Sequence, residues 1–280
     1  MKVKIFGTIL LFVTVLVGAA ACGGNDTAPN GMTATDLLET SYNISLSLNT
    51  SQMYSTSTWS THNDTITLTE TSNEFSCIDN LNHRRYRSLN ASENISSTLS
   101  SISSDSEYYA FNNSLYLYKS STSNWIKTQS PVDSWDQERY ANIFPLFTNP
   151  TPDAKYIGME TIGGIGCYKI EQNLTSDNMM KDFGYGVMGA FGNITQSDVK
   201  CTYWIAENTF YLMKASLAGN VVWVTDNIPM SLNISEIAIY SGINQPLNIS
   251  LPEAAINATE ISYSDYKSIG TGASLWFPFP

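Results

Sequence analysis

The residues of this chain that could carry chemistry are few, and they do not group into a catalytic pattern. His62 and His83 are its two histidines, and both lie in polar stretches typical of strand edges. They form no H-x-x-x-H pair and have no neighbouring cysteine, so a metal site is not indicated. The acidic residues are mostly scattered singly, and no G-x-S-x-G nucleophile motif occurs. The sequence therefore predicts a protein that is not an enzyme and that uses no cofactor or metal.

For two further patterns, an ordinary structural interpretation outweighs the functional one. Gly184, Gly186 and Gly189 spell G-x-G-x-x-G, but a dinucleotide site needs this motif in the strand-to-helix turn of a βαβ unit. Here antiparallel strand signals surround it, which disfavours nucleotide binding. Arg84 and Arg85, with Arg87, form the one basic cluster. We interpret it as a solvated strand edge rather than a contact for a lipid headgroup.

The cysteines divide into one near the N-terminus and three farther along. Cys77, Cys167 and Cys201 can form at most one disulfide among themselves. Cys167 and Cys201 each lie at the start of an expected strand, and the two strands are expected to be neighbours. In an oxidising compartment this favours a bridge between them, with Cys77 left as a buried thiol.

The N-terminal segment has the organisation of an export signal. A positive start at Lys2 and Lys4 precedes the apolar run Ile5–Val17 and a small-residue region that ends at Cys22. This pattern resembles a lipoprotein box, in which the cysteine is lipidated and becomes the new N-terminus. An ordinary signal peptide with a chance cysteine, or an uncleaved anchor helix, is the alternative. We expect a signal peptide over 1–21, a lipid anchor at Cys22 and a flexible tether over 22–33.

Composition limits the partners of the chain. Charged residues make up 14% of its 280 residues, and the net charge of −11 argues against nucleic acid as a partner. Many N-x-S/T sequons indicate glycosylation outside the cell. Together with the lipoprotein box and the acidic composition, they are typical of an archaeal envelope protein. They include Asn43, Asn49, Asn63, Asn90, Asn94, Asn112, Asn173, Asn193, Asn233, Asn248 and Asn257.

Most of the chain has the pattern of β-strands. Val199–Gly219 predicts a hairpin with aromatic arms and a turn at Glu207–Thr209, and Tyr108–Lys127 predicts a second hairpin that turns at Asn112. A capping box at Thr33–Asp36 predicts a short N-terminal helix. Further strands are expected over Tyr42–Leu48, Tyr54–Ser60, Asp64–Thr69, Glu74–Ile78, His83–Leu89, Val221–Val224, Ser231–Tyr240 and Leu247–Ile249, and a loop over Asn90–Ser106.

Two apolar segments between strands predict helices that could line a ligand cavity. Ser134–Phe147 carries Trp135, Ile143 and Phe144, and Ser176–Gly192 is rich in Met and Phe at near-helical spacing. Methionine adapts to ligands of variable shape, so the second helix is a candidate lid, although an ordinary core-facing helix explains the pattern equally well. The residues of this lid that could contact a ligand are Met179, Phe183, Val187, Met188 and Phe191.

These elements predict an α+β fold. Consecutive strands favour an antiparallel sheet, and a sheet of about ten strands has to curl, close or split. We expect one large antiparallel curled sheet, an open half β-barrel, with two or three helices on its concave side. The domain should cover residues 34–266, followed by an aromatic C-terminal tail over 267–280.

The order of several short motifs resembles a known superfamily. They are Tyr116-Leu-Tyr118, Trp125-Ile-Lys127, Gly166-Cys-Tyr-Lys-Ile170, Tyr203-Trp-Ile205 and Asn244-Gln-Pro246 through Leu251-Pro252-Glu253. Together they are similar to the LolA-like carriers of lipoproteins and the related LppX/LprG-type lipoproteins. The resemblance implies a half-barrel whose concave face holds acyl chains.

Two functional hypotheses follow from the sequence. The first is a membrane-tethered extracytoplasmic lipoprotein that binds or carries a lipid or lipoprotein acyl chain in an apolar cavity. It would sit on the outer face of the cytoplasmic membrane, within the cell envelope. The alternative is a non-enzymatic structural or interaction module with a closed core. A hydrolase with an unrecognised site is a weaker third possibility.

Overall fold

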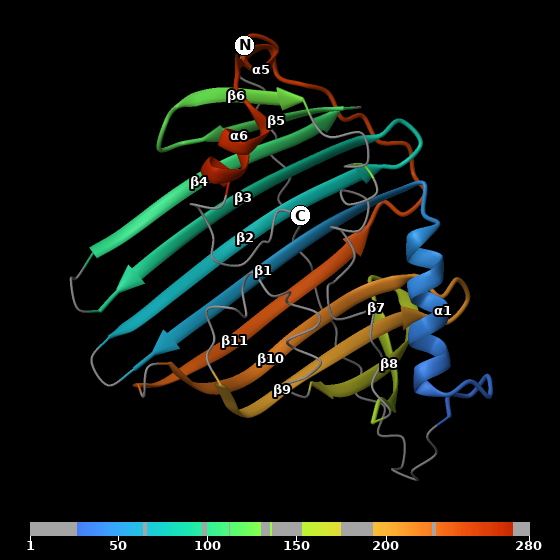
Figure 1. The fold of residues 1–280 in the computed structure, drawn as a ribbon. Coiled ribbons are helices and arrows are strands. Elements are labelled where there is room, and N and C mark those ends of the chain that lie inside the picture. The colour runs from blue at the N-terminus through green and yellow to red at the C-terminus, as the bar shows by residue number, and fades with distance from the viewer. Residues whose placement is uncertain are drawn as a thin grey trace.

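The fold is a single curled β-sheet with short helices at its margins. A computed structural model describes residues 27–63, 66–96, 100–111, 113–129, 135, 153–174, 193–225 and 228–270. Its sheet has twelve strands in the order β12-β6-β5-β4-β3-β2-β1-β11-β10-β9-β8-β7 (Figure 1). Their bounds are β1 Thr50–His62, β2 Thr67–Asp79, β3 Arg84–Ile95, β4 Ser100–Phe111, β5 Ser114–Lys119, β6 Asn124–Gln129, β7 Lys155–Ile162, β8 Ile165–Leu174, β9 Asn193–Ala206, β10 Leu212–Thr225, β11 Ile228–Ser241 and β12 Thr259–Glu260.

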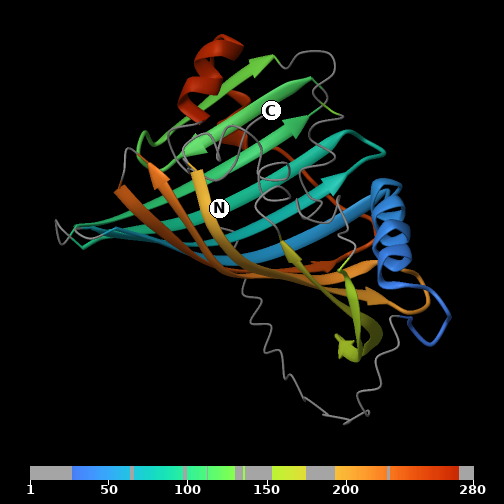
Figure 2. The same ribbon diagram turned by 60° about the horizontal axis from the view of Figure 1, so that its bottom comes forward.

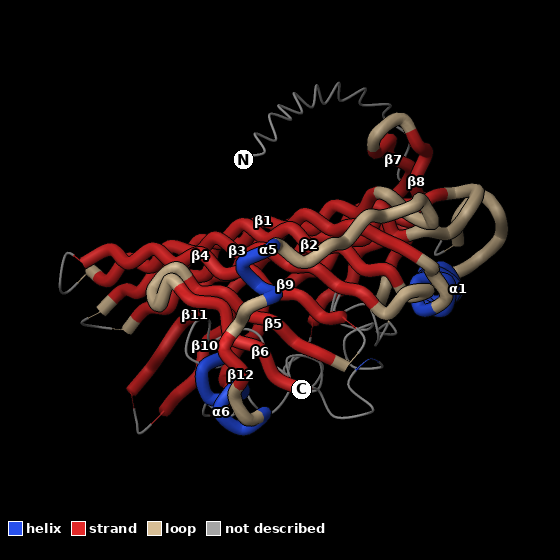
Figure 3. The backbone as a smooth tube through the Cα atoms, turned by 90° about the horizontal axis from the view of Figure 1, so that it is seen from above, coloured by secondary structure: helices blue, strands red, loops and turns tan. Residues whose placement is uncertain are grey.

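The sheet curls so that it has a concave and a convex face (Figure 2). Consecutive strands pair antiparallel from β1 to β6 and from β7 to β11, β1 also pairs antiparallel with β11, and the short β12 pairs parallel with β6. Helices α1 (Ala34–Leu46) and α6 (Tyr263–Gly270) lie on one side of the sheet. The loop that carries α5 (Glu253–Ile256) crosses the other side (Figure 3). The predicted fold class, a large curled antiparallel sheet in an α+β protein, is confirmed.

Helix α1 begins at the capping box that the sequence predicted. The Thr33 hydroxyl accepts a hydrogen bond from the backbone N–H of Asp36, and the Asp36 carboxylate accepts one from the backbone N–H of Thr33. The helix continues to Leu46, so the strand predicted over Tyr42–Leu48 is wrong. The buried side chains of the helix are Ala34, Leu37, Leu38 and Ser41, which follow the i, i+3, i+4, i+7 spacing of one helix face.

We expect Thr33→Ala to lower the free energy of unfolding by about 1 kcal/mol, because the backbone N–H of Asp36 loses the hydroxyl that caps it. Chemical denaturation with circular dichroism as the signal would measure it. Thr35→Ala, in the same helical turn but outside the capping box, is the matched control. Equal losses in the two variants would contradict the assignment of the cap.

The strands are longer than the sequence indicated. β2 runs without interruption through the gap expected between Asp64–Thr69 and Glu74–Ile78. The loop predicted over Asn90–Ser106 is wrong, because β3 extends to Ile95 and β4 begins at Ser100. Serine and asparagine are poor strand formers alone, yet the full antiparallel ladder to both neighbours satisfies their backbone groups. The strand expected at Leu247–Ile249 is instead a loop.

The two predicted hairpins are confirmed. β9 and β10 meet at the turn after Ala206, where the Phe210 N–H donates to the Ala206 carbonyl. β4 and β5 meet around Asn113. The signal peptide, Cys22 and the aromatic end of the tail lie outside the described residues. None of the helices in the described ranges is long and apolar enough to cross a membrane.

Candidate functional site

One half of the concave face carries a large apolar cluster. Alternate residues of β8 to β11 and β1 point to this face, because successive side chains of a strand point to opposite sides. α1 lies across one end and contributes Leu37 and Leu38. The buried members from the sheet include Ile170, Val199, Tyr203, Ile205, Leu217, Val221, Ile234, Ala238, Met53 and Trp59. We call this group the first apolar cluster.

The opposite margin of the concave face carries a second, smaller apolar cluster. It consists of Tyr108 and Ala110 of β4, Leu115 and Leu117 of β5, and Tyr266 of α6. The Lys119 ammonium donates to the backbone carbonyl of Ile269, which fixes the end of α6 over the sheet. The concave face is therefore apolar toward both margins.

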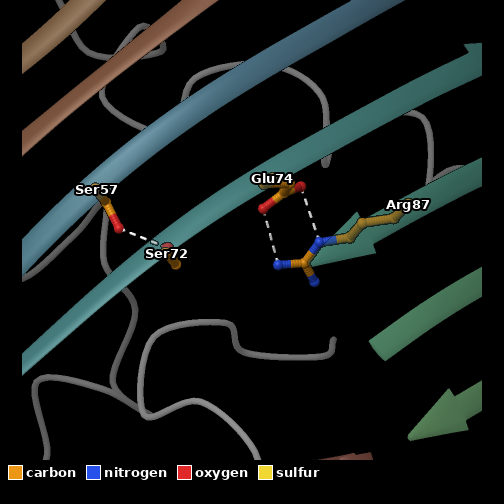
Figure 4. A network of polar contacts seen from close by, with 4 residues as sticks. All are labelled: Ser57, Ser72, Glu74 and Arg87. Carbon is orange, nitrogen blue, oxygen red and sulfur yellow. Dashed lines mark hydrogen bonds and ion pairs between the residues drawn. The ribbon is translucent and has the colours of Figure 1, made fainter. Parts of the chain in front are cut away.

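Between the two clusters the concave face is polar. The Ser57 and Ser72 hydroxyl oxygens, on β1 and β2, are 2.7 Å apart. On β2 and β3, Glu74 and Arg87 form a two-point ion pair, with Nε–Oε1 at 2.8 Å and Nη2–Oε2 at 2.9 Å (Figure 4). Their side chains are only 4% and 11% exposed, respectively. We call these four residues and Glu236 of β11 the polar belt.

Glu236 is the polar-belt residue with the most altered acidity. Its Cα partners are Ser57 on β1 and Leu217 on β10, which places it beside the serines and at the edge of the first apolar cluster. Burial raises the pKa of Glu236 to about 7, and the negative charge of Glu74 contributes in the same direction. The carboxyl of Glu236 is consequently poised to bind or release a proton near neutral pH.

Other charged groups surround the polar belt. Glu70 of β2 is the cross-strand partner of Glu93 on β3, and burial together with that like charge raises the pKa of Glu70. On the other side, the Arg85 guanidinium lies 5.8 Å from the centre of the Tyr108 ring, toward the second apolar cluster. Arg85 is buried and Arg87 nearly so, which corrects the interpretation of this basic cluster as a solvated strand edge.

The convex face has one covered part and one open part. Ile249 of the loop after β11 packs with Cys77 and Tyr109 there, and burial raises the pKa of the Cys77 thiol to about 11. An aromatic row continues from Tyr109 through Tyr86, with ring centres 4.7 Å apart. Beyond it lies an open patch, the convex patch, made of Phe75 (37% exposed), Tyr54 (48%), Ile237 (40%) and Ile239 (37%).

The structure describes three of the site residues predicted from the sequence. Trp135 is helical, stacks on the His83 ring with centres 5.0 Å apart, and packs against the second apolar cluster. Cys167 and Cys201 are not joined by a disulfide. The Cα partner of Cys167 is Ala206 and that of Cys201 is Gln172, so the predicted bridge is wrong because the register separates the two residues along the strands. The others, Ile143, Phe144, Met179, Phe183, Val187, Met188 and Phe191, lie outside the described residues.

The polar belt is not evident from the sequence. Glu74 and Glu236 are far apart along the chain, and only the β2-β1-β11 order brings them onto one face. A signal was present in the alternation of Glu70, Ser72, Glu74 and Ser76, which predicts one polar face of a strand. Within the described ranges no group of three or more His, Cys, Asp or Glu residues could hold a metal ion.

No protein-family model and no curated protein sequence matches the chain. Among solved structures, it is similar to LprF from Mycobacterium bovis, with a TM-score of 0.42 and 12% identity over 82% of this chain and 99% of that one. It is also similar to the Mycobacterium tuberculosis lipoprotein LppX, with a TM-score of 0.41 and 15% identity over 78% and 98% of the two chains. A DUF1329 family protein from Desulfovibrio piger has a TM-score of 0.26 and 12% identity over 78% and 93%. These are likenesses in the course of the chain.

Proposed function

We propose that this protein binds the acyl chain of a lipid or lipoprotein on its concave face. The observation that carries the proposal is the pair of apolar clusters at the two margins of one concave sheet face, with α1 and α6 beside them. Removing one buried CH₂ group of a ligand from water contributes about 0.8 kcal/mol, so a long chain supplies enough binding free energy without catalytic groups. The proposed role is accordingly that of a binder or carrier rather than an enzyme.

The proposal includes a location. A lipid on Cys22 would hold the domain at the outer face of the cytoplasmic membrane, close to its ligand. Mass spectrometry of the protein from its native host would show the mass of the acyl groups and of glycans. A mature chain without lipid at Cys22 would remove the tether from the account and leave the concave-face site to be judged separately.

Uptake of an alkyl chain with a minimal headgroup tests the binding site. We expect the full chain to bind labelled dodecanol, and Trp59→Ala, on the concave side of β1, to weaken binding about fivefold to tenfold by removing apolar contact area. Tyr54→Ala is the matched control, because it truncates an aromatic side chain of the same strand on the convex side. Thermal unfolding of both variants checks that each is folded.

Failure of the wild-type chain to bind dodecanol, with a native mass spectrum that shows no co-purified lipid, would contradict the proposal. It would favour the second candidate function, a non-enzymatic interaction module of the cell envelope. The convex patch is the observation that favours that alternative, since it joins exposed apolar side chains of three adjacent strands. In that case Tyr54→Ala, and not Trp59→Ala, would weaken the interaction.

A further inference from the structure

The polar belt lies where a simple acyl-chain pocket would be expected to be apolar. It interrupts the concave face between the two apolar clusters and consists of residues from four adjacent strands, β11, β1, β2 and β3. Buried charged groups are costly unless they are paired, so an ion pair and a further carboxyl in this position call for a reason beyond packing. A ligand with one polar end and one apolar end would supply it.

The two carboxyl groups of the polar belt differ in their partners, because among the described residues Glu74 is paired with a cation and Glu236 is not. Arg87 is committed to Glu74 through two short contacts, which neutralises that carboxylate. Glu236 receives no hydrogen bond from the part of the chain that the structure describes, and the nearest charge that acts on it is the like charge of Glu74. Its side chain is deep on the concave face but keeps some exposure to solvent, so a small group can reach it.

The surroundings of Glu236 select the sign of that group. An anion would meet the Glu236 carboxyl next to a Glu74 carboxylate that Arg87 already neutralises, with the acidic Glu70 and Glu93 farther along β2 and β3. A cation would find an unpaired carboxyl in Glu236 and an acceptor in the Ser57 hydroxyl beside it. Leu217, the other cross-strand partner of Glu236, is a buried member of the first apolar cluster, so an alkyl chain attached to the cation would begin beside apolar side chains.

We propose that Glu236, with Ser57 and the Glu74–Arg87 pair beside it, binds the cationic ammonium headgroup of an amphiphile whose alkyl chain lies over the first apolar cluster. This rests on the proposed function and adds the headgroup class to it. Binding transfers no group. The ammonium donates its N–H bonds to the Glu236 carboxylate, and any proton on that carboxyl is released to solvent.

Three probes with the same alkyl chain separate the headgroup from the chain. Equilibrium binding of labelled dodecylamine, dodecanol and dodecanoate is measured at neutral pH on the full chain, captured on a resin. We expect dodecylamine to bind at least about tenfold more tightly than dodecanol, because one charge-assisted hydrogen bond contributes about 1.5 to 3 kcal/mol and each 1.4 kcal/mol is tenfold. Glu236→Gln should reduce dodecylamine to the affinity of dodecanol and leave dodecanol binding as it was.

The matched control is Glu107→Gln. Glu107 is another partly buried carboxyl with a raised pKa caused by burial, but it points to the convex face from β4. Its substitution should leave the preference for dodecylamine intact. Equal affinity for the three probes, or a preference for the amine that survives in Glu236→Gln, would overturn the headgroup site while the acyl-chain site stands. A preference for dodecanoate would also overturn it and point to Arg85 as the headgroup partner. No binding of any probe would overturn the proposed function itself.

Discussion

Arg87→Met is expected to lower the free energy of unfolding by about 3 to 5 kcal/mol, the cost of leaving a buried carboxylate without its partner. Glu74 and Arg87 are joined by two contacts below 3 Å, and their side chains are almost entirely removed from solvent. A surface ion pair, by comparison, contributes at most about 1 kcal/mol. Urea denaturation of the purified variant, followed by tryptophan fluorescence, measures the difference.

The double variant Glu74→Met/Arg87→Met shows whether the loss comes from the orphaned charge. Replacing both members of a buried pair by apolar side chains of similar volume is often close to neutral. We therefore expect the double variant to recover most of the stability lost by Arg87→Met. A single variant that loses less than about 1 kcal/mol would show that solvent screens the pair, and it would contradict the buried polar belt.

Glu236→Gln is expected to stabilise the protein above neutral pH by up to about 3 kcal/mol and to change little under acidic conditions. The pKa of Glu236 is about 7 in the folded protein, against an ordinary glutamate value of 4.5. Between these two values the unfolded chain has released the proton while the folded protein still holds it. The stability that this group contributes is thus complete at low pH and is lost as the pH rises from about 4.5 through about 7. Glutamine does not titrate, so it removes this loss.

The measurement is the difference between the stability curves of wild type and Glu236→Gln over that pH range. Taking the difference cancels the contributions of Glu70 and Glu107, whose pKa values burial also raises. We expect the difference to grow steadily with pH and to level off above about pH 8. A difference that stays constant with pH would mean that Glu236 has an ordinary pKa, and it would remove the argument that its carboxyl is deep and lacks a partner.

The sequence predicted the architecture well because hairpins and caps are local. The turn after Ala206 and the capping box at Thr33 depend on a few consecutive residues, and both are confirmed. The lengths of β2, β3 and β4 were underestimated because their many Ser and Asn residues are poor strand formers. What holds them in the sheet is pairing on both sides, which is a property of the neighbours.

The site depended on contacts that single strands do not encode. The prediction of a disulfide between Cys167 and Cys201 is wrong because cross-strand register cannot be obtained from either strand alone. Glu236 and Glu74 lie in one site only because β1, the first strand along the chain, pairs with β11, a strand near its end. Trp135 does lie against an apolar cluster, as a residue lining the concave side would.

Photo-crosslinking gives the most direct test of the central claim that the concave face binds an acyl chain. The full chain is incubated with a dodecyl amphiphile that carries a diazirine at the end of its chain, and after illumination the labelled peptides are sequenced. We expect labels on concave-facing residues of the first apolar cluster, such as Trp59, Leu217 and Ile234, and their loss in competition with dodecylamine. Labels confined to Tyr54, Phe75, Ile237 and Ile239 of the convex patch would contradict it.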